Sequence, residues 1–335
     1  MASASPASAA ASAADTAVVL VNLGTPDEPN TAAVRRYLAE FLHDRRVVDM
    51  NRWLWCPLLH FAILPLRSGK VAHKYASVWL PEGSPLAVHT RRLAESLQRE
   101  LPQLRVLHAM RYGKPEVSVR IQALLDQGCD RILLVPLYPQ YAAATSATAC
   151  DQAFKALMQM RWQPTVRVSP PYHDDPVYIE AIAQSIREGL AKLDFEPEVI
   201  LTSFHGVPKS YLLKGDPYHC QCVKTGRLIR EALGFSPERM RTTFQSRFGN
   251  EEWLKPYTDE TVQALAKSGV KRMAIVAPRF TADCLETLEE LDGENRHYFE
   301  ENGGERFAYI PCLNDGDLGM RVIEHVVARE LKGWV

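Results

Sequence analysis

The sequence predicts an α/β protein with two similar Rossmann-like domains, each built on a doubly wound parallel sheet. At 335 residues the chain exceeds the usual size of a single hydrophobic core, which favours two domains. Short apolar stretches alternate with amphipathic ones, as they do where helices join parallel strands. Residues 128–138 also resemble residues 269–280, and residues 18–26 resemble residues 199–208. Either a duplication or chance similarity between buried strands, which draw on few residue types, explains this pattern.

In the first half, strands are expected at Thr16–Leu23, Arg105–Met110 and Arg131–Leu137, because each is a short apolar run bounded by turn residues. Thr31 can cap an amphipathic helix that extends to about Leu42. A further helix is expected at Val117–Gln127, between the second and third strands. We assign residues 16–165 to an N-terminal domain.

The second half repeats this alternation of strands and helices. Its candidate strands are Thr165–Val168, Glu198–Phe204, Met240–Phe244, Val270–Ala277 and Arg306–Ile310. We assign residues 166–312 to a C-terminal domain, and we expect residues 313–335 to form a helix that packs back on the N-terminal domain.

An apolar stretch broken by prolines, Trp53–Leu66, lies in an insertion at about residues 51–80. It is shorter than the ~18 apolar residues that would span a bilayer. The flanking basic residues are Arg45, Arg46, Arg52, Arg67 and Lys70. An apolar segment with basic flanks is typical of an element that lies in the membrane interface. We expect a lip that touches the membrane surface, and a helix buried under the first domain is the alternative.

Composition and charge exclude several classes of protein. With 39 basic and 40 acidic side chains the formal net charge is -1, which lacks the basic excess of a nucleic-acid binder. Residues 1–15 are almost all Ala and Ser, without the features of a secretory signal, and are expected to form a disordered tail. Seven cysteines favour reduced thiols in the cytoplasm. We expect a cytoplasmic protein that attaches peripherally to the inner face of the cytoplasmic membrane.

His205 is the first candidate for a functional residue. It ends the apolar run Val199–Phe204 and precedes Gly206 and Pro208, so we expect it at the carboxyl end of a buried parallel strand. Ligands of open α/β sheets lie just beyond such strand ends. An imidazole there can act as a base or bind a metal, because its ordinary pKa is about 6.5. The alternative is a histidine that only hydrogen-bonds its own turn.

Five motifs occur in an order that resembles the ferrochelatase family. They are Leu20–Pro26, Tyr138–Tyr141, Lys214–Tyr218, Gln245–Leu254 and Asp283–Glu290. The resemblance extends from about Val18 to the C-terminal helix. It implies two chelatase-type domains that flank a porphyrin cleft. It also implies a lyase that inserts Fe²⁺ into protoporphyrin IX and releases two protons, which is the terminal step of haem biosynthesis.

The resemblance also implies roles for individual residues. His205 and Glu286 are expected to bind the iron and to act in catalysis together with Arg67. The residues expected to contact the porphyrin are Leu23, Tyr75, Ser84, Arg111, Tyr112, Tyr138, Gln245, Ser246, Trp253 and Phe280. Taken singly, an aromatic residue among these belongs more often to the core than to a site.

Acidic residues after residue 282 suggest a path for iron or protons. Glu286, Glu290 and Glu294 recur at steps of four, so they would lie along one face of an α-helix, about 6 Å apart. Asp283 would extend the same face by one turn. We expect this file to carry iron in or protons out, and a solvated stripe is the alternative for Glu294.

The cysteines do not form a recognisable cluster site. Cys220 and Cys222 beside His219 resemble half of a metal site, but the sequence lacks a second close pair. Some relatives bind a [2Fe-2S] cluster through cysteines that this chain lacks, so we expect no such cluster and no permanently bound cofactor. Two positions depart from the family: Cys284 replaces a histidine found in some relatives, and Arg279 replaces a residue that is often small.

Two other functions compete with iron insertion into protoporphyrin. A sister chelatase would insert Co²⁺ or Ni²⁺ into another tetrapyrrole, but it is not expected to keep both the Gln245–Trp253 and Asp283–Glu290 motifs. A non-catalytic tetrapyrrole carrier would not need the pair His205 and Glu286. The apolar lip favours protoporphyrin IX over coproporphyrin III, which is more polar.

Overall fold

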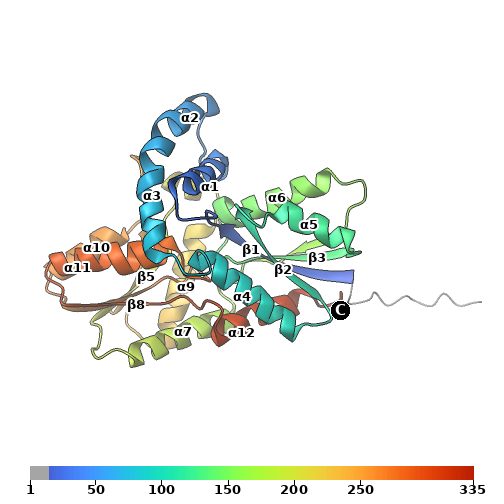
Figure 1. Cartoon of the computed structure of the whole chain (residues 1–335). Coiled ribbons are helices and arrows are strands. Elements are labelled where there is room, and N and C mark those ends of the chain that lie inside the picture. Colours follow the sequence, from blue (N-terminus) through green and yellow to red (C-terminus); the bar gives the residue numbers. More distant parts are fainter. Residues whose placement is uncertain (1–14) are drawn as a thin grey trace, which may run out of the picture.

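The computed structural model describes residues 15–335, so residues 1–14 of the expected tail lie outside the described part. Two four-stranded sheets lie side by side, and every strand pair in them is parallel (Figure 1). The first has the order β2 (Arg105–Tyr112), β1 (Thr16–Gly24), β3 (Arg131–Pro136), β4 (Thr165–Val168). The second has the order β6 (Met240–Gln245), β5 (Val199–His205), β7 (Arg272–Val276), β8 (Arg306–Ile310). The α/β prediction is confirmed.

The two sheets have the same strand order, which supports the duplication seen in the sequence. In each, the first strand along the chain lies between the second and the third, and the fourth is at the edge. β3 and β7, whose sequences resemble each other, therefore occupy equivalent positions, as do β1 and β5. Their equivalent carboxyl ends are the places where both halves can present residues to one ligand.

The assignment of Thr165–Val168 to the second half was wrong. These residues form β4, which pairs with β3 from Arg131↔Thr165 to Leu134↔Val168. A short strand with a half-buried pattern indicates a sheet edge, but the sequence does not say which sheet it joins. The first sheet therefore extends beyond residue 165.

Helices cover both sheets. They are α1 (Thr31–His43), α2 (Arg52–Leu58), α3 (Leu64–Val78), α4 (Pro85–Glu100), α5 (Val117–Asp126), α6 (Thr148–Met158), α7 (Pro176–Ala191), α8 (Lys209–Leu213), α9 (Tyr218–Leu233), α10 (Thr258–Lys267), α11 (Arg296–Glu301) and α12 (Asp317–Glu330). Among the described residues, three π-helices accompany them: η2 (Leu59–Ile63), η3 (Ala143–Ala147) and η4 (Glu286–Asn295). The cap of α1 is Asn30 rather than Thr31, because the Asn30 side chain accepts a hydrogen bond from Ala33 N at 2.9 Å.

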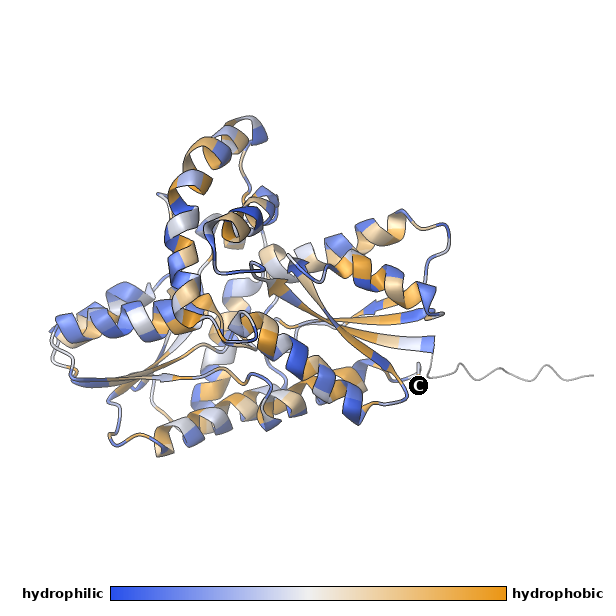
Figure 2. Ribbon diagram, viewed as in Figure 1, coloured by the Kyte–Doolittle hydropathy of each residue, from blue (hydrophilic) through white to orange (hydrophobic). Residues whose placement is uncertain are grey.

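One hydrophobic core runs through both halves. It joins residues of β1 and β3 to residues of β5 and β7 through α4, α7 and α12. Apolar residues follow the strands and the inner faces of these helices (Figure 2). The end of the chain also reaches the first sheet, since Arg131 Nη1 donates to the carbonyl of Trp334 at 3.2 Å and Arg167 Nη1 to that of Glu330. This shared core fixes the two sheets relative to each other.

The insertion at residues 51–80 projects from the first domain as α2, η2 and α3 (Figure 1). Its base is anchored by the buried Trp55, Leu59 and Leu64. Its outer side chains are strongly exposed, with 88% of Trp53 and 85% of Phe61 accessible to solvent. The stretch is thus helical but is not buried under the domain. Among residues 15–335, no helix has the length and apolar character needed to cross a membrane.

Candidate functional site

His205 is the last residue of β5, as expected from the sequence. Its Nδ1 lies 2.6 Å from the carbonyl oxygen of Gly206, which can only accept, so Nδ1 carries the proton and Nε2 keeps its lone pair. The following glycine is required by close packing, because a Cβ on Gly206 would lie 2.8 Å from Gln245 O and 3.2 Å from the Trp253 ring. Tight turn packing therefore holds the imidazole in place.

The surroundings keep His205 neutral. Burial lowers the pKa of His205 below its ordinary value, and the nearby positive charge of Arg279 lowers it further. The carboxylate of Glu286 opposes both effects and raises the pKa, but the net shift is downward. Glu286 and His205 are thus close enough to interact electrically although 80 residues separate them in sequence. A neutral imidazole can accept a proton or bind a metal.

Glu286 is the first residue of η4, and this element is a π-helix rather than the α-helix expected from the spacing. Gln245 Nε2 donates to the backbone carbonyl of Glu286 at 2.9 Å, which ties the end of β6 to the start of η4. π-Helical segments occur frequently at functional sites. Because a π-turn contains more residues than an α-turn, steps of four do not keep the acids on one line.

Glu290 lies in η4 and contacts Ser246, the residue that follows β6. Its carboxylate accepts hydrogen bonds from Ser246 N at 2.7 Å and Ser246 Oγ at 2.5 Å. Burial raises the pKa of Glu290 to about 7, with Glu286 adding to the rise and the bonds from Ser246 opposing it. Ser246 has a φ of 66°, a strained conformation for a residue other than glycine. This carboxyl group can therefore exchange a proton near neutral pH.

Two members of the expected acidic file, Glu294 and Asp283, are bound to partners in other segments. Glu294 is bound by Lys74 Nζ of α3 at 2.5 Å, together with Glu289 at 2.9 Å. Asp283 precedes η4 and is buried.

The Asp283 carboxylate accepts hydrogen bonds from Tyr309 Oη at 2.5 Å, Asn314 Nδ2 at 2.7 Å and Thr287 Oγ1 at 3.1 Å. These bonds hold the loop after β8, so Asp283 does not extend the face of the helix as expected.

The other expected site residues differ in their exposure to solvent. Tyr75 is buried, and burial raises its pKa, with a further rise from the charge of Glu286. Arg67 is exposed on α3, and its guanidinium lies 5.8 Å from the ring centroid of Phe248. Trp253 is buried against the same Phe248 ring at 4.9 Å. Leu23 and Phe280 are partly buried at strand ends, whereas Ser84 is buried as the N-cap of α4.

Arg111 and Tyr112 belong to a separate cluster around Asp44. The Asp44 carboxylate accepts hydrogen bonds from Arg111 Nη2 at 2.6 Å, from Tyr112 Oη at 2.9 Å and from Thr148 Oγ1. Burial alone would raise the pKa of Asp44, but these bonds and the charge of Arg111 lower it. Asp44 remains ionised, and the sequence reading did not single it out because no motif contains it.

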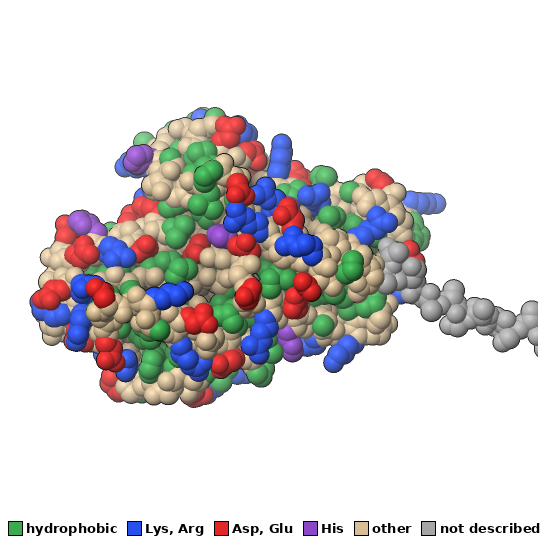
Figure 3. Space-filling model, turned by 60° about the horizontal axis from the view of Figure 1, so that its bottom comes forward, with side chains coloured by type: hydrophobic (Ala, Val, Ile, Leu, Met, Phe, Trp, Pro, Cys, Tyr) green, Lys and Arg blue, Asp and Glu red, His purple; other side chains and the backbone are tan. Residues whose placement is uncertain are grey.

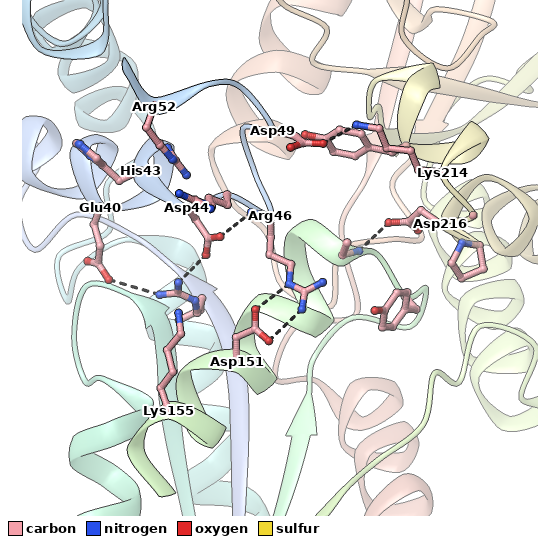
Figure 4. Close-up of a pocket in the computed structure, with 17 residues that line it drawn as sticks. Glu40, His43, Asp44, Arg46, Asp49, Arg52, Asp151, Lys155, Lys214 and Asp216 are labelled. Carbon is pink, nitrogen blue, oxygen red and sulfur yellow. Dashed lines mark hydrogen bonds and ion pairs between the residues drawn. The ribbon is translucent and has the colours of Figure 1, made fainter. Parts of the chain in front are cut away.

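A cavity of about 890 Å³ opens beside this cluster, between the two halves (Figure 4). Arg46 and Asp151 of the first half line this cavity as an ion pair, 2.7 Å apart, and Lys214 of the second half pairs with Asp49 at 2.5 Å (Figure 4). Arg111 is the residue expected to bind substrate that lines this cavity. The volume is in the range of small-molecule and cofactor sites.

The cysteine pair on α9 is divided between the surface and the interior. Cys220 is exposed on α9 whereas Cys222 is buried, so the two thiols face different surroundings. Over residues 15–335, no three His, Cys, Asp or Glu side chains form a group that could hold a metal ion. Charges of both signs are interspersed on the face shown in Figure 3, without the continuous basic surface of a nucleic-acid binder.

Comparison with known proteins gives consistent results. A profile of the family described as Ferrochelatase matches residues 15–331. Ferrochelatase of Allorhizobium ampelinum is 58% identical over 323 residues, which cover 95% of this chain and 94% of the relative. Ferrochelatase of Rhizobium meliloti is 57% identical over 323 residues, covering 95% of each.

Solved structures confirm the fold independently. SirB from Bacillus subtilis with Fe3+ has a TM-score of 0.56 at 12% identity and covers 95% of this chain and 98% of that one. The sirohydrochlorin chelatase SirB from Bacillus subtilis subspecies spizizenii, in complex with cobalt, has a TM-score of 0.51 at 12% identity over 95% of this chain and 97% of that one. At such identity these structures show the fold alone. The family profile and the curated relatives confirm the resemblance, and the chain belongs to the ferrochelatase family.

Proposed function

We propose that this chain is a lyase that inserts Fe²⁺ into protoporphyrin IX, at a site formed by His205 and Glu286. Iron insertion into protoporphyrin is the standard reaction of the family to which the chain belongs. The observation that supports the site assignment is that Gln245, which pairs with His205 between β6 and β5, donates to the backbone carbonyl of Glu286 at 2.9 Å and so brings the start of η4 to the end of β5.

The chemistry requires that two pyrrole protons leave while iron loses its water ligands. In the proposed mechanism His205 Nε2 accepts a proton from the macrocycle or binds the incoming iron, because this nitrogen keeps its lone pair. Glu286 supplies a negative charge for Fe²⁺ and a second proton acceptor. An imidazole with one carboxylate binds ferrous iron less firmly than thiolates would, which allows iron to pass to the porphyrin.

One assay tests this function against its alternatives. The purified protein is incubated anaerobically with protoporphyrin IX and Fe²⁺, and haem is measured by its absorbance. We expect each protein molecule to form more than one haem, so that the haem concentration exceeds the protein concentration. Binding of porphyrin without turnover would instead indicate a carrier, and turnover confined to Co²⁺ or Ni²⁺ with another tetrapyrrole would indicate a sister chelatase.

Glu290 is proposed to continue the proton or iron route beyond Glu286. Its pKa of about 7 means that lowering the pH from 8 to 6 protonates Glu290 and removes a negative charge from the path of Fe²⁺. We expect the apparent KM for Fe²⁺ to rise as the pH falls. Glu290→Gln should raise this KM by about tenfold at pH 8 and abolish this part of its pH dependence, with little change in the porphyrin KM.

Glu294→Gln provides the contrast for this prediction. Glu294 shares Lys74 with Glu289, so loss of its charge leaves the ion pair between Lys74 and Glu289 in place. A smaller rise in the iron KM is expected than for Glu290→Gln. Wild-type iron kinetics in both variants would restrict the path to Glu286.

The lip is proposed to rest on a membrane surface, which would place the protein at the inner face of the cytoplasmic membrane. Replacement of Trp53, Leu58 and Phe61 by serine should weaken liposome binding by about 10²-fold. The variant lacks the exposed apolar side chains whose burial in the membrane interface would favour binding. Thermal stability should stay within a few degrees of wild type. Binding is measured by sedimentation with anionic liposomes.

Two controls separate membrane contact from core packing. Trp162→Ser removes an apolar side chain that is 60% exposed but lies outside the lip, and it should not change liposome binding. Trp55→Ser removes a buried side chain from the base and should lower stability. If the triple variant unfolds as Trp55→Ser does, the exposed lip residues belong to the core and the membrane proposal is wrong.

A further inference from the structure

Within the described part of the chain, Arg279 is a buried cation without an anionic partner. Only 8% of it is exposed, and it lies just beyond the carboxyl end of β7. Its Nε and Nη1 atoms are buried and have no hydrogen-bond partner, and among residues 15–335 its guanidinium forms no ion pair. A charge in the protein interior is costly unless a counter-charge and hydrogen bonds compensate it. The buried guanidinium of Arg279 would therefore be stabilised by an anion that accepts hydrogen bonds from it.

Aromatic rings surround this guanidinium. The Arg279 Cζ atom lies 5.0 Å from the ring centroid of Tyr218 and 5.8 Å from those of Tyr138 and Phe280. The rings attract the cation but cannot neutralise it. Tyr218 Oη already donates to the carbonyl of His205 at 2.8 Å, whereas the buried Tyr138 Oη has no partner. The guanidinium and the Tyr138 hydroxyl thus bring unpartnered donors to one place.

The position of these donors within the fold favours a ligand site. Tyr138 follows β3 and Arg279 follows β7, and these strands occupy equivalent positions in the two sheets. The donors therefore meet between the halves, beyond the carboxyl ends of the strands, where ligands of α/β proteins bind. Arg279 also lies close enough to His205 to influence the charge of the imidazole. The donors belong to the same region as the proposed catalytic site.

We propose that Arg279 and Tyr138 form a carboxylate subsite between the two halves, beyond the carboxyl ends of β3 and β7. A guanidinium matches the two oxygens of a carboxylate, and the tyrosine hydroxyl adds a further donor. The carboxylate has two sources, an acidic side chain of the porphyrin substrate or a small free carboxylate. The first source rests on the proposed function, whereas the second is independent of it.

Thermal unfolding tests the subsite without iron or porphyrin. Acetate, added in exchange for chloride at constant ionic strength, should raise the Tm of the wild-type protein, because it binds the folded state. Arg279→Met should lose this response, and Tyr138→Phe should reduce it. Without acetate, Arg279→Met should be at least as stable as wild type, since the variant no longer buries an unpaired charge.

Arg296→Met is the matched control. Arg296 also lies over an aromatic ring, with its Cζ atom 5.0 Å from the centroid of Phe307, but it has an ionic partner in Asp292. This variant should keep the response to acetate. A marked loss of stability in Arg279→Met alone would show that the guanidinium is part of the core, and that result would overturn the subsite.

Porphyrin binding distinguishes the two sources. Protoporphyrin IX and its dimethyl ester are bound without metal, and quenching of porphyrin fluorescence gives each Kd. Arg279→Met should raise the Kd of the free acid by roughly 10–100-fold, as expected for a lost charge-assisted hydrogen bond, and change that of the ester by less than about twofold. Arg279→Lys should recover part of the binding of the free acid.

The acetate and porphyrin assays together separate the two sources of the carboxylate. Equal effects on acid and ester, with the acetate response lost in Arg279→Met, support a subsite for a free carboxylate. A wild-type protein that responds to acetate but binds neither porphyrin contradicts the proposed function and leaves the subsite standing. No acetate response in wild type, combined with equal effects on the two porphyrins, overturns the inference, because water alone then satisfies the donors.

Discussion

Replacement of His205 by alanine should lower the rate of iron insertion by more than about 10³-fold while the fold is kept. The variant loses Nε2, the nitrogen that we assign as proton acceptor and iron ligand, and these two functions together account for a loss of this size. The stability cost should be only about 1 kcal/mol, since the imidazole makes one hydrogen bond, from Nδ1 to the carbonyl of Gly206. Haem absorbance and thermal unfolding measure the two effects.

His219→Ala is the control for this experiment. His219 lies on α9, where its ring stacks on Phe244 at 5.7 Å, and it is the histidine beside Cys220 and Cys222. It should keep turnover near that of wild type. If His205→Ala keeps most of its activity, the assignment of His205 is wrong. A large loss in His219→Ala would point instead to chemistry on α9.

The strands of both sheets could be predicted from the sequence, because each is a short apolar run with turn residues at its ends. Their grouping into sheets could not be predicted in full. β4 has only four residues, Thr165–Val168, and nothing in them specifies that they pair with β3. Partners of an edge strand are fixed by the three-dimensional path of the chain, which periodicity does not reveal.

The placement of a candidate site residue was predictable where that residue ends a strand, as His205 ends β5. Geometry was less predictable, because the spacing of acids after residue 282 fits an α-helix, whereas η4 is a π-helix. Hydrogen bonds between segments that are distant in the chain could not be predicted from the sequence either. Asp283 is bound by Tyr309 and Asn314, and Lys74 of α3 binds Glu294, across separations of 26, 31 and 220 residues.

Arg279 illustrates a different limit. The sequence shows that it departs from a position where relatives often have a small residue, but burial without a partner is visible only in the structure. Likewise, Asp44 lies in no motif, yet it joins Arg111, Tyr112 and Thr148 in one cluster. The Asp44 cluster joins distant segments of the first half, and Arg279 lies near Tyr138 of the other half, so neither arrangement can be predicted from the local sequence.

Glu286→Gln should lower kcat by about 10²-fold or more and should also change the pH profile. The glutamine keeps the backbone carbonyl that accepts from Gln245 Nε2 at 2.9 Å, so the start of η4 should remain intact. The lost carboxylate removes a charge that raises the pKa of His205. Its removal therefore lowers that pKa further, and His205 stays neutral at a lower pH than in wild type.

The acid limb of kcat/KM should accordingly shift toward lower pH in Glu286→Gln, even though activity at every pH is reduced. A purely structural role of Glu286 would reduce activity without moving the limb, so the profile separates the two explanations. Glu289→Gln is the matched control, because Glu289 is a neighbouring acid that is bound to Lys74 at 2.9 Å. It should keep both the rate and the profile of wild type. An unshifted acid limb in Glu286→Gln would show that Glu286 and His205 do not interact during catalysis, and the proposed pair would have to be abandoned.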